Sequence, residues 1–118
     1  MTPGTYNFPS HRRGNTFNGH SFEINQNGNP VDFTGAEIKI QFRTTPESRH
    51  VVMEWLTSDG SITISGVGNN FINMEARDGE DMDVLPGVYK YDIQVVLSNG
   101  VTNTYVKGSM KIVNDITR

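Results

Sequence analysis

Three histidines, His11, His20 and His50, are the first candidates for acid–base chemistry near neutral pH. A hydrolytic site would need one of them within hydrogen-bond reach of an activated nucleophile. The chain has no cysteine, and no Gly-x-Ser-x-Gly, His-Glu-x-x-His or phosphate-binding P-loop pattern surrounds the histidines. We therefore expect all three to be loop or strand-surface residues. We predict no catalytic residue and expect the chain not to be an enzyme.

The segment Asp78-Gly-Glu-Asp-Met-Asp83 places four carboxylates within six residues. Calcium takes several oxygen ligands from loops of this kind. The spacing departs from the Asp-x-Asp-x-Asp-Gly pattern of a calcium loop, so we expect a solvated acidic loop between two strands. No metal and no cofactor is predicted, and a metal-dependent activity at this loop is kept as a third alternative.

The basic run His11-Arg12-Arg13 follows shortly after two aromatic residues. Arginine beside aromatic side chains is typical of protein interfaces. Three basic residues are too few for a phosphate-binding surface on a chain whose formal net charge is -3, so no nucleic-acid partner is expected. We predict a partner interface at Tyr6, Phe8, His11, Arg12 and Arg13, with an ordinary solvated loop as the alternative.

Alternating apolar residues predict the strands that must position these side chains. Residues 36–43 alternate strictly, with Ile38, Ile40 and Phe42 on one face. Residues 89–97 repeat this period, and the turn Ser98-Asn99-Gly100 predicts a hairpin into residues 101–107. Further strands are expected at residues 17–25, 51–56, 62–65, 71–76 and 110–113.

Together these strands predict an all-β, two-layer antiparallel β-sandwich. Turn signals recur about every 8–12 residues, and no segment has the helical apolar spacing of a crossover helix. A length of 118 residues fits one domain, residues 1–118, and not two. The expected core is Phe22, Ile24, Ile38, Ile40, Phe42, Val51, Met53, Trp55, Ile62, Ile64, Ile72, Met74, Tyr91, Ile93, Val95, Val106 and Ile112. The orientation of strands 51–56 and 71–76 stays open, because both of their faces carry apolar residues.

No uninterrupted apolar run approaches about 18 residues, and the first residues lack an apolar stretch behind a basic start. We therefore expect no signal peptide, no transmembrane segment and no membrane partner.

Four segments carry a family resemblance through their order: Gly4-Thr-Tyr-Asn-Phe8, Arg13-Gly-Asn-Thr-Phe17, Asn27-Gly-Asn-Pro-Val-Asp-Phe-Thr-Gly-Ala36 leading into Ile38–Arg43, and Pro86-Gly-Val-Tyr-Lys-Tyr-Asp-Ile93. They resemble the N-terminal immunoglobulin-like domain of tailed-phage baseplate upper proteins, over a span from Gly4 to Thr117. The resemblance implies an immunoglobulin-like sandwich. Because the chain has no cysteine for an inter-sheet disulfide, we expect packing around Trp55, Ile38 and Ile93 to hold the sheets together.

The resemblance also implies a non-enzymatic phage or prophage virion protein, in the tail, baseplate or head, that acts as an assembly or attachment module. Its implied partners are other phage structural proteins, including copies of itself. Its implied location is the virion, after synthesis in the bacterial host cytoplasm. The alternative is a small carbohydrate-binding module that stacks a surface glycan on aromatic rings such as Tyr6, Phe8, Tyr89 or Trp55, which requires those rings to be exposed together.

Overall fold

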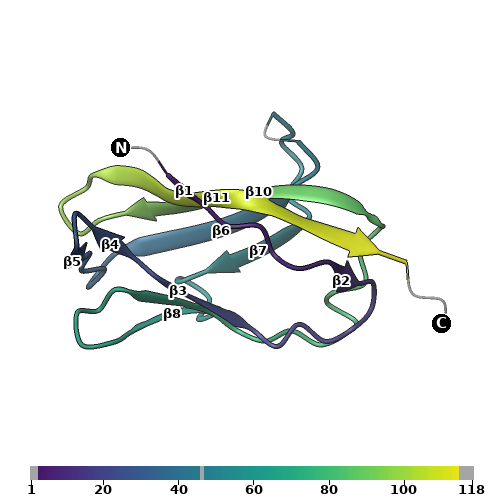
Figure 1. Ribbon diagram of the computed structural model, residues 1–118, viewed down its shortest axis with the longest axis horizontal. Helices are drawn as coiled ribbons and strands as arrows, with labels where there is room; N and C mark the ends of the chain where they lie inside the picture. Colours follow the sequence, from purple (N-terminus) through teal and green to yellow (C-terminus); the bar gives the residue numbers. More distant parts are fainter. Residues whose placement is uncertain (1–2, 46, 115–118) are drawn as a thin grey trace.

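The computed structural model describes residues 3–45 and 47–114, and all regular elements in these ranges are strands. The larger sheet contains β1 (Gly4–Thr5), β2 (His11–Arg12), β6 (Glu37–Arg43), β7 (Met53–Leu56), β10 (Gly87–Val96) and β11 (Thr102–Val113). The smaller sheet contains β3 (His20–Glu23), β8 (Ile62–Ser65) and β9 (Phe71–Met74), and β4 (Asn25–Gln26) pairs with β5 (Asn29–Pro30) as a separate hairpin. The two sheets form two layers (Figure 1), which confirms the predicted all-β sandwich.

The strand order is that of an immunoglobulin-like sandwich. In the larger sheet β10 lies between β11 and β6, with β7 outside β6, and in the smaller sheet β9 lies between β3 and β8. These are the two sheets of that Greek-key fold. The chain start departs from the predicted antiparallel arrangement, because β1 and β2 both pair with β11 in parallel. The first residues therefore form one edge of the larger sheet instead of a free loop.

The core lies between the two sheets and follows the predicted alternation. Ile38, Ile40 and Phe42 of β6 are at most 1% exposed. The orientation that the sequence left open is resolved by Met53 and Trp55 of β7 and by Ile72 and Met74 of β9, which are all buried. Within the predicted core, Val51 and Ile64 are only half-buried. The buried apolar residues outside the predicted core list are Phe8, Phe17, Phe33, Ala36, Met82, Tyr89, Tyr105 and Met110.

Aromatic packing joins the two layers without a disulfide. Phe8, whose N–H donates to β11, meets Phe22 of β3 edge-on at a centroid distance of 6.0 Å. Within the larger sheet, Phe42 stacks on Tyr91 at 5.0 Å and meets Trp55 edge-on at 5.7 Å. Trp55 is fully buried, and its Nε1 donates a hydrogen bond to Glu75 O at 3.1 Å. The Arg77 guanidinium lies 3.9 Å from the centre of the Trp55 ring. Trp55, Ile38 and Ile93 are thus all buried in the core, and their role in holding the sheets together stays a prediction.

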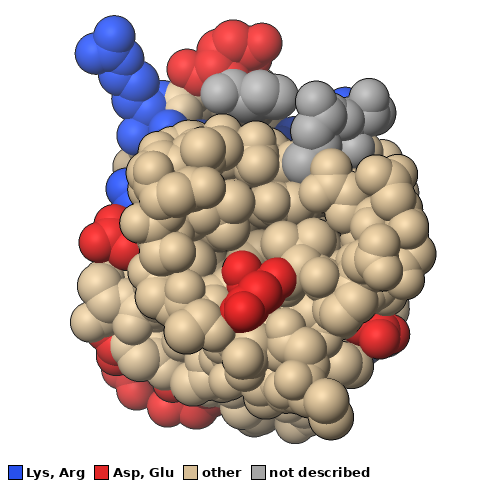
Figure 2. All heavy atoms as spheres, turned by 90° about the vertical axis from the view of Figure 1, so that its left-hand side faces the viewer, with Lys and Arg blue, Asp and Glu red and all other residues tan. Residues whose placement is uncertain are grey.

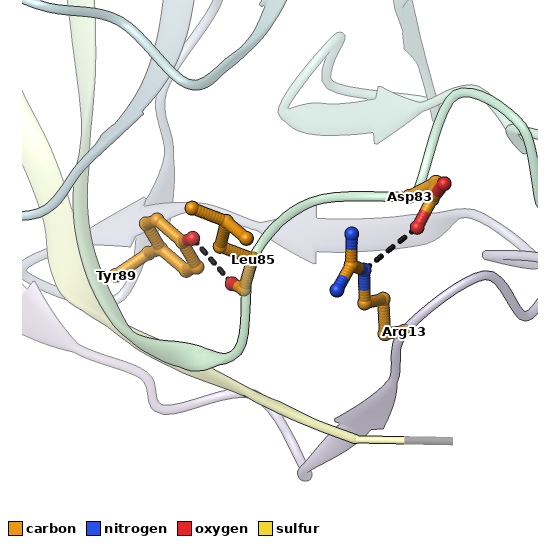
Figure 3. A network of polar contacts seen from close by, with 4 residues as sticks. All are labelled: Arg13, Asp83, Leu85 and Tyr89. Carbon is orange, nitrogen blue, oxygen red and sulfur yellow. Dashed lines mark hydrogen bonds and ion pairs between the residues drawn. The ribbon is translucent and has the colours of Figure 1, made fainter. Parts of the chain in front are cut away.

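The connection between β9 and β10 contains a tyrosine corner, a feature typical of immunoglobulin-like sandwiches. The Tyr89 hydroxyl donates a hydrogen bond to Leu85 O at 2.5 Å (Figure 3). Burial raises the pKa of the Tyr89 hydroxyl, which keeps the group protonated and able to donate. Tyr91 follows two residues later, at the position where antibody domains carry the second cysteine of their disulfide.

The N-terminal segment is fastened to β11 beside a glycine. The backbone N–H groups of Tyr6 and Phe8 donate to carbonyls of β11 at 3.0 and 2.8 Å, and the Tyr91 hydroxyl donates to Tyr6 O at 2.6 Å. A Cβ atom at Gly108 would lie 1.8 Å from Tyr6 O. Only glycine at position 108 therefore lets the segment lie this close to the strand.

Candidate functional site

The structure places the aromatic residues of the predicted interface against the core. Phe8 is 8% exposed, because it faces inward from the segment that is fastened to β11. Tyr6 is half-buried and stacks on the ring of His20 at a centroid distance of 4.8 Å. Phe8 therefore lies in the core and not on the predicted surface.

The basic residues of the predicted interface lie along and just after β2. Arg12 is exposed, and His11 Nε2 lies 2.9 Å from Asn15 O. Arg13 Nε lies 2.7 Å from Asp83 Oδ1, in an ion pair that ties β2 to the acidic loop (Figure 3). Arg13 thus has a structural contact, and use of this region as a partner interface stays a prediction.

The acidic loop at residues 78–83 is solvated, as predicted, and lies between β9 and β10. Its four carboxylate residues are exposed, while Met82 is 0% exposed and anchors the loop to the core. Asp78 Oδ1 accepts a hydrogen bond from Asp81 N at 3.0 Å, which fixes the turn. In the ranges that the structure describes, no three His, Asp or Glu side chains come together as a metal site. The loop therefore has a structural explanation.

The structure does not assemble an aromatic platform for a sugar. Trp55 is 0%, Tyr89 4% and Phe8 8% exposed, and Tyr6 stacks on His20. A carbohydrate-binding module needs ring faces that are exposed together. The carbohydrate-binding alternative required these rings to be exposed together, and their burial therefore argues against it.

His20 is packed among aromatic rings, and its acid–base behaviour should be measurable. Burial lowers the pKa of His20 below its usual value of about 6.5. As the pH falls through about 6.5, the unfolded chain binds a proton at His20 before the folded chain does. The free energy of unfolding therefore decreases with falling pH until the pH reaches the folded-state pKa of His20. We expect Tm to fall more steeply between about pH 7.5 and about pH 5.5 in the wild type than in His20→Gln. His50→Gln, at an exposed position, should keep the wild-type slope. Equal slopes for His20→Gln and the wild type would contradict this expectation.

Three connections lie at one end of the sandwich, on the left of Figure 1, and we call residues 25–36, 66–70 and 97–101 the loop end. Of the 22 residues in these connections only Asp32 is charged, whereas charged residues make up 19% of the chain. In Figure 2, which faces this end, one acidic side chain lies near the middle of the face, the other acidic side chains lie around the rim, and basic side chains project at the upper left. The loop end is therefore a mostly neutral surface of Asn, Gly, Ser and Val.

Contacts between the connections hold the loop end together. Phe33 N donates to Asn69 O at 3.0 Å, which joins residues 25–36 to residues 66–70. The side-chain amide of Asn70 donates to Ile24 O at 3.3 Å, and Phe33 itself is fully buried. A Cβ at Gly68 would lie 2.8 Å from Pro30 Cβ, which shows how closely the two loops approach. These contacts hold residues 25–36 against residues 66–70.

Asp32, the one charged residue of the loop end, is engaged within its own turn. Its Oδ1 accepts hydrogen bonds from Thr34 N at 2.9 Å and Thr34 Oγ1 at 2.6 Å. The side-chain and backbone hydrogen bonds of Thr34 lower the pKa of Asp32, so the carboxylate stays ionised near neutral pH. Sequence reasoning used these connections only as separators between strands. Their common lack of charge was the signal that could have identified them.

A groove of about 400 Å³ lies on the exposed face of the larger sheet. We call it the sheet-face groove. Its polar walls come from β1, β6, β10 and β11 and consist of Thr5, Gln41, Arg43, Lys90, Asp92 and Lys107. The Arg43 guanidinium donates to Gln41 Oε1 at 2.7 Å and to Ser48 O at 2.5 Å. Arg43 is thus held in place by two neutral acceptors.

The described residues form a two-layer, immunoglobulin-like β-sandwich. No family model and no curated protein matches the chain. Among solved structures, CopC from Methylosinus trichosporium OB3b is similar to it, with a TM-score of 0.44 and 12% identity over 91% of this chain and 88% of CopC.

The comparisons do not support the predicted phage virion role: neither the family models nor the curated proteins supply a phage relative, and the similar solved structure named above is a CopC. Separately, none of the described residues form a helix long and apolar enough to cross a membrane.

Proposed function

We propose that this protein is a non-enzymatic protein-binding domain and that the loop end is its partner-binding surface. The observation that carries this proposal is that 22 residues with a single charge, Asp32, form one end of the sandwich. Charged residues are depleted at the cores of protein interfaces, whereas Asn, Ser and Gly are common in loops that bind other proteins. A neutral partner surface with hydrogen-bonding groups fits this end best.

Preorganisation supports the same proposal. Binding residues are often carried on loops that a rigid scaffold positions, and loops that are ordered beforehand lose less entropy on binding. Here the hydrogen bond from Phe33 to Asn69 and the contact of Gly68 with Pro30 join two of the loops. The third loop, residues 97–101, also lies close to residues 25–36, because a Cβ atom at Gly35 would lie 3.5 Å from Ser98 Cβ.

The non-enzymatic part of the proposal is supported by the surroundings of the histidines. His11 contacts the backbone carbonyl of Asn15, and His20 packs against Tyr6 and Phe22. Neither arrangement is that of a base activating a hydroxyl nucleophile.

The test compares two exposed apolar residues at opposite ends of the sandwich. Val67 in the loop end is fully exposed, and Leu85 beside the tyrosine corner is 70% exposed. Immobilised wild-type domain, Val67→Lys and Leu85→Lys are used to enrich proteins from the cells that produce it, with quantification by mass spectrometry. We expect a partner that the wild type and Leu85→Lys retain equally and that Val67→Lys retains about tenfold less, since a charge is buried at the contact. A partner lost with Leu85→Lys and retained by Val67→Lys would contradict the proposal.

A further inference from the structure

The sheet-face groove contains a pair of like charges in direct opposition. In the register of β6 and β10, Arg43 pairs with Lys90, and both side chains line the groove. Lys90 in turn pairs with Ser109 of β11, two residues beyond Lys107, so Lys107 is its diagonal neighbour. Like charges directly opposite each other on a sheet destabilise the fold. Three cationic side chains therefore surround one hollow at a cost to the free domain.

None of these cations forms a direct ion pair with a carboxylate of the described residues. Considering the described residues alone, none of Arg43, Lys90 and Lys107 has a carboxylate oxygen within 4.0 Å. The two acceptors that hold the Arg43 guanidinium, Gln41 Oε1 and Ser48 O, are neutral. The Arg43 guanidinium is therefore held in position without a direct ion pair, and the three cations of the groove outnumber its one carboxylate, Asp92.

Asp92 is the acidic residue of the groove. It pairs with Gln41 on one side and with Lys107 on the other. Burial raises the pKa of the Asp92 carboxyl, and the nearby Arg43 acts in the opposite direction. A carboxylate repels an anionic ligand, so Asp92 should lower the affinity of the groove for anions.

We propose that Arg43, Lys90 and Lys107 bind an oxyanion group of a ligand, a phosphate or a carboxylate, in the sheet-face groove. Guanidinium groups bind such oxyanions through paired N–H donors, and lysine ammonium groups add charge. A bound anion would offset the repulsion between Arg43 and Lys90. This role would explain why two like charges that destabilise the free domain face each other at an exposed position. This site is separate from the loop end and does not depend on it.

The first experiment follows backbone amide shifts by NMR while inorganic phosphate or succinate is added at constant ionic strength. We expect saturable shifts in the amides of Lys90, Asp92 and Lys107. Shifts with phosphate alone assign the site to phosphoryl groups, and shifts with succinate alone assign it to carboxylates. Lys90→Gln should weaken binding at least fivefold and Asp92→Asn should strengthen it. Lys111→Gln, at an exposed position of β11 outside the groove walls, should bind like the wild type.

Thermal unfolding of the same proteins supplies a second readout. Without added anion, Lys90→Gln should raise Tm by about 2 °C because the like-charge pair is gone, while Lys111→Gln should not. Phosphate or succinate should raise Tm of the wild type and should raise Tm of Lys90→Gln clearly less at the same concentration. The proposal is overturned if neither anion gives saturable shifts, or if Lys111→Gln weakens binding as much as Lys90→Gln.

Discussion

Replacement of Gly108 by alanine is expected to detach the N-terminal segment from β11 and to lower the free energy of unfolding by about 3 kcal/mol. The added Cβ would lie 1.8 Å from Tyr6 O, and a backbone oxygen cannot yield as a flexible side chain would. Displacement of Tyr6 also withdraws Phe8 from the core and leaves the Tyr91 hydroxyl without its acceptor. Hydrogen exchange should show early loss of protection at the Tyr6 and Phe8 amides, and Tm should fall by about 12 °C.

The same substitution at Gly4 is the matched control. A Cβ at Gly4 would lie 3.7 Å from Tyr105 O, which is an ordinary van der Waals distance. Gly4→Ala should therefore keep Tm and the protection of the Tyr6 and Phe8 amides close to those of the wild type. If Gly108→Ala behaves like Gly4→Ala, the parallel pairing of the N-terminal segment with β11 is wrong.

Truncation of Trp55 to alanine should destabilise the domain by about 3–5 kcal/mol, which corresponds to a fall in Tm of roughly 12–20 °C. The Trp55 side chain is fully buried between the layers, where it contacts Phe17 and Phe42 edge-on. Its removal leaves a cavity, takes the ring from beneath the Arg77 guanidinium and leaves Glu75 O without the indole donor. Differential scanning calorimetry measures the change.

Trp55→Phe separates these contributions. Phenylalanine keeps a ring under Arg77 and much of the buried volume, but it cannot donate to Glu75 O. We expect this variant to lose less than half as much stability as Trp55→Ala. A Trp55→Ala protein with wild-type Tm would show that the two layers are held together elsewhere.

Much of the fold could be predicted because its central strands alternate. Residues 37–43 and 87–96 bury every second side chain, so their type and orientation follow from the sequence. β11 was expected as two strands because Gly108 and Ser109 look like a turn. Gly108 instead lies within β11, where the absence of a side chain leaves space for the backbone oxygen of Tyr6. The N-terminal strands were missed because two-residue strands have no period, and Phe8, an isolated apolar residue, gave no sign that it belongs to the core.

The candidate surfaces were harder to predict because they depend on positions in space. The turn Asn27-Gly-Asn-Pro30, the run at residues 66–70 and the turn at residues 98–100 are visible in the sequence, but only the sheet topology brings them to one end. The opposition of Arg43 and Lys90 depends on the register between β6 and β10, which side-chain alternation alone does not determine. The adjacent residues Arg12 and Arg13 predicted a partner interface from the sequence, whereas in the structure Arg13 forms an ion pair with Asp83.

The most direct test of the proposed function is hydrogen exchange of the domain alone and in complex with the partner retained by the wild type and lost with Val67→Lys. The account predicts slower exchange at the loop end, residues 25–36, 66–70 and 97–101, with unchanged exchange at β2 and residues 78–83. Slower exchange at β2 and residues 78–83, with an unchanged loop end, would contradict it.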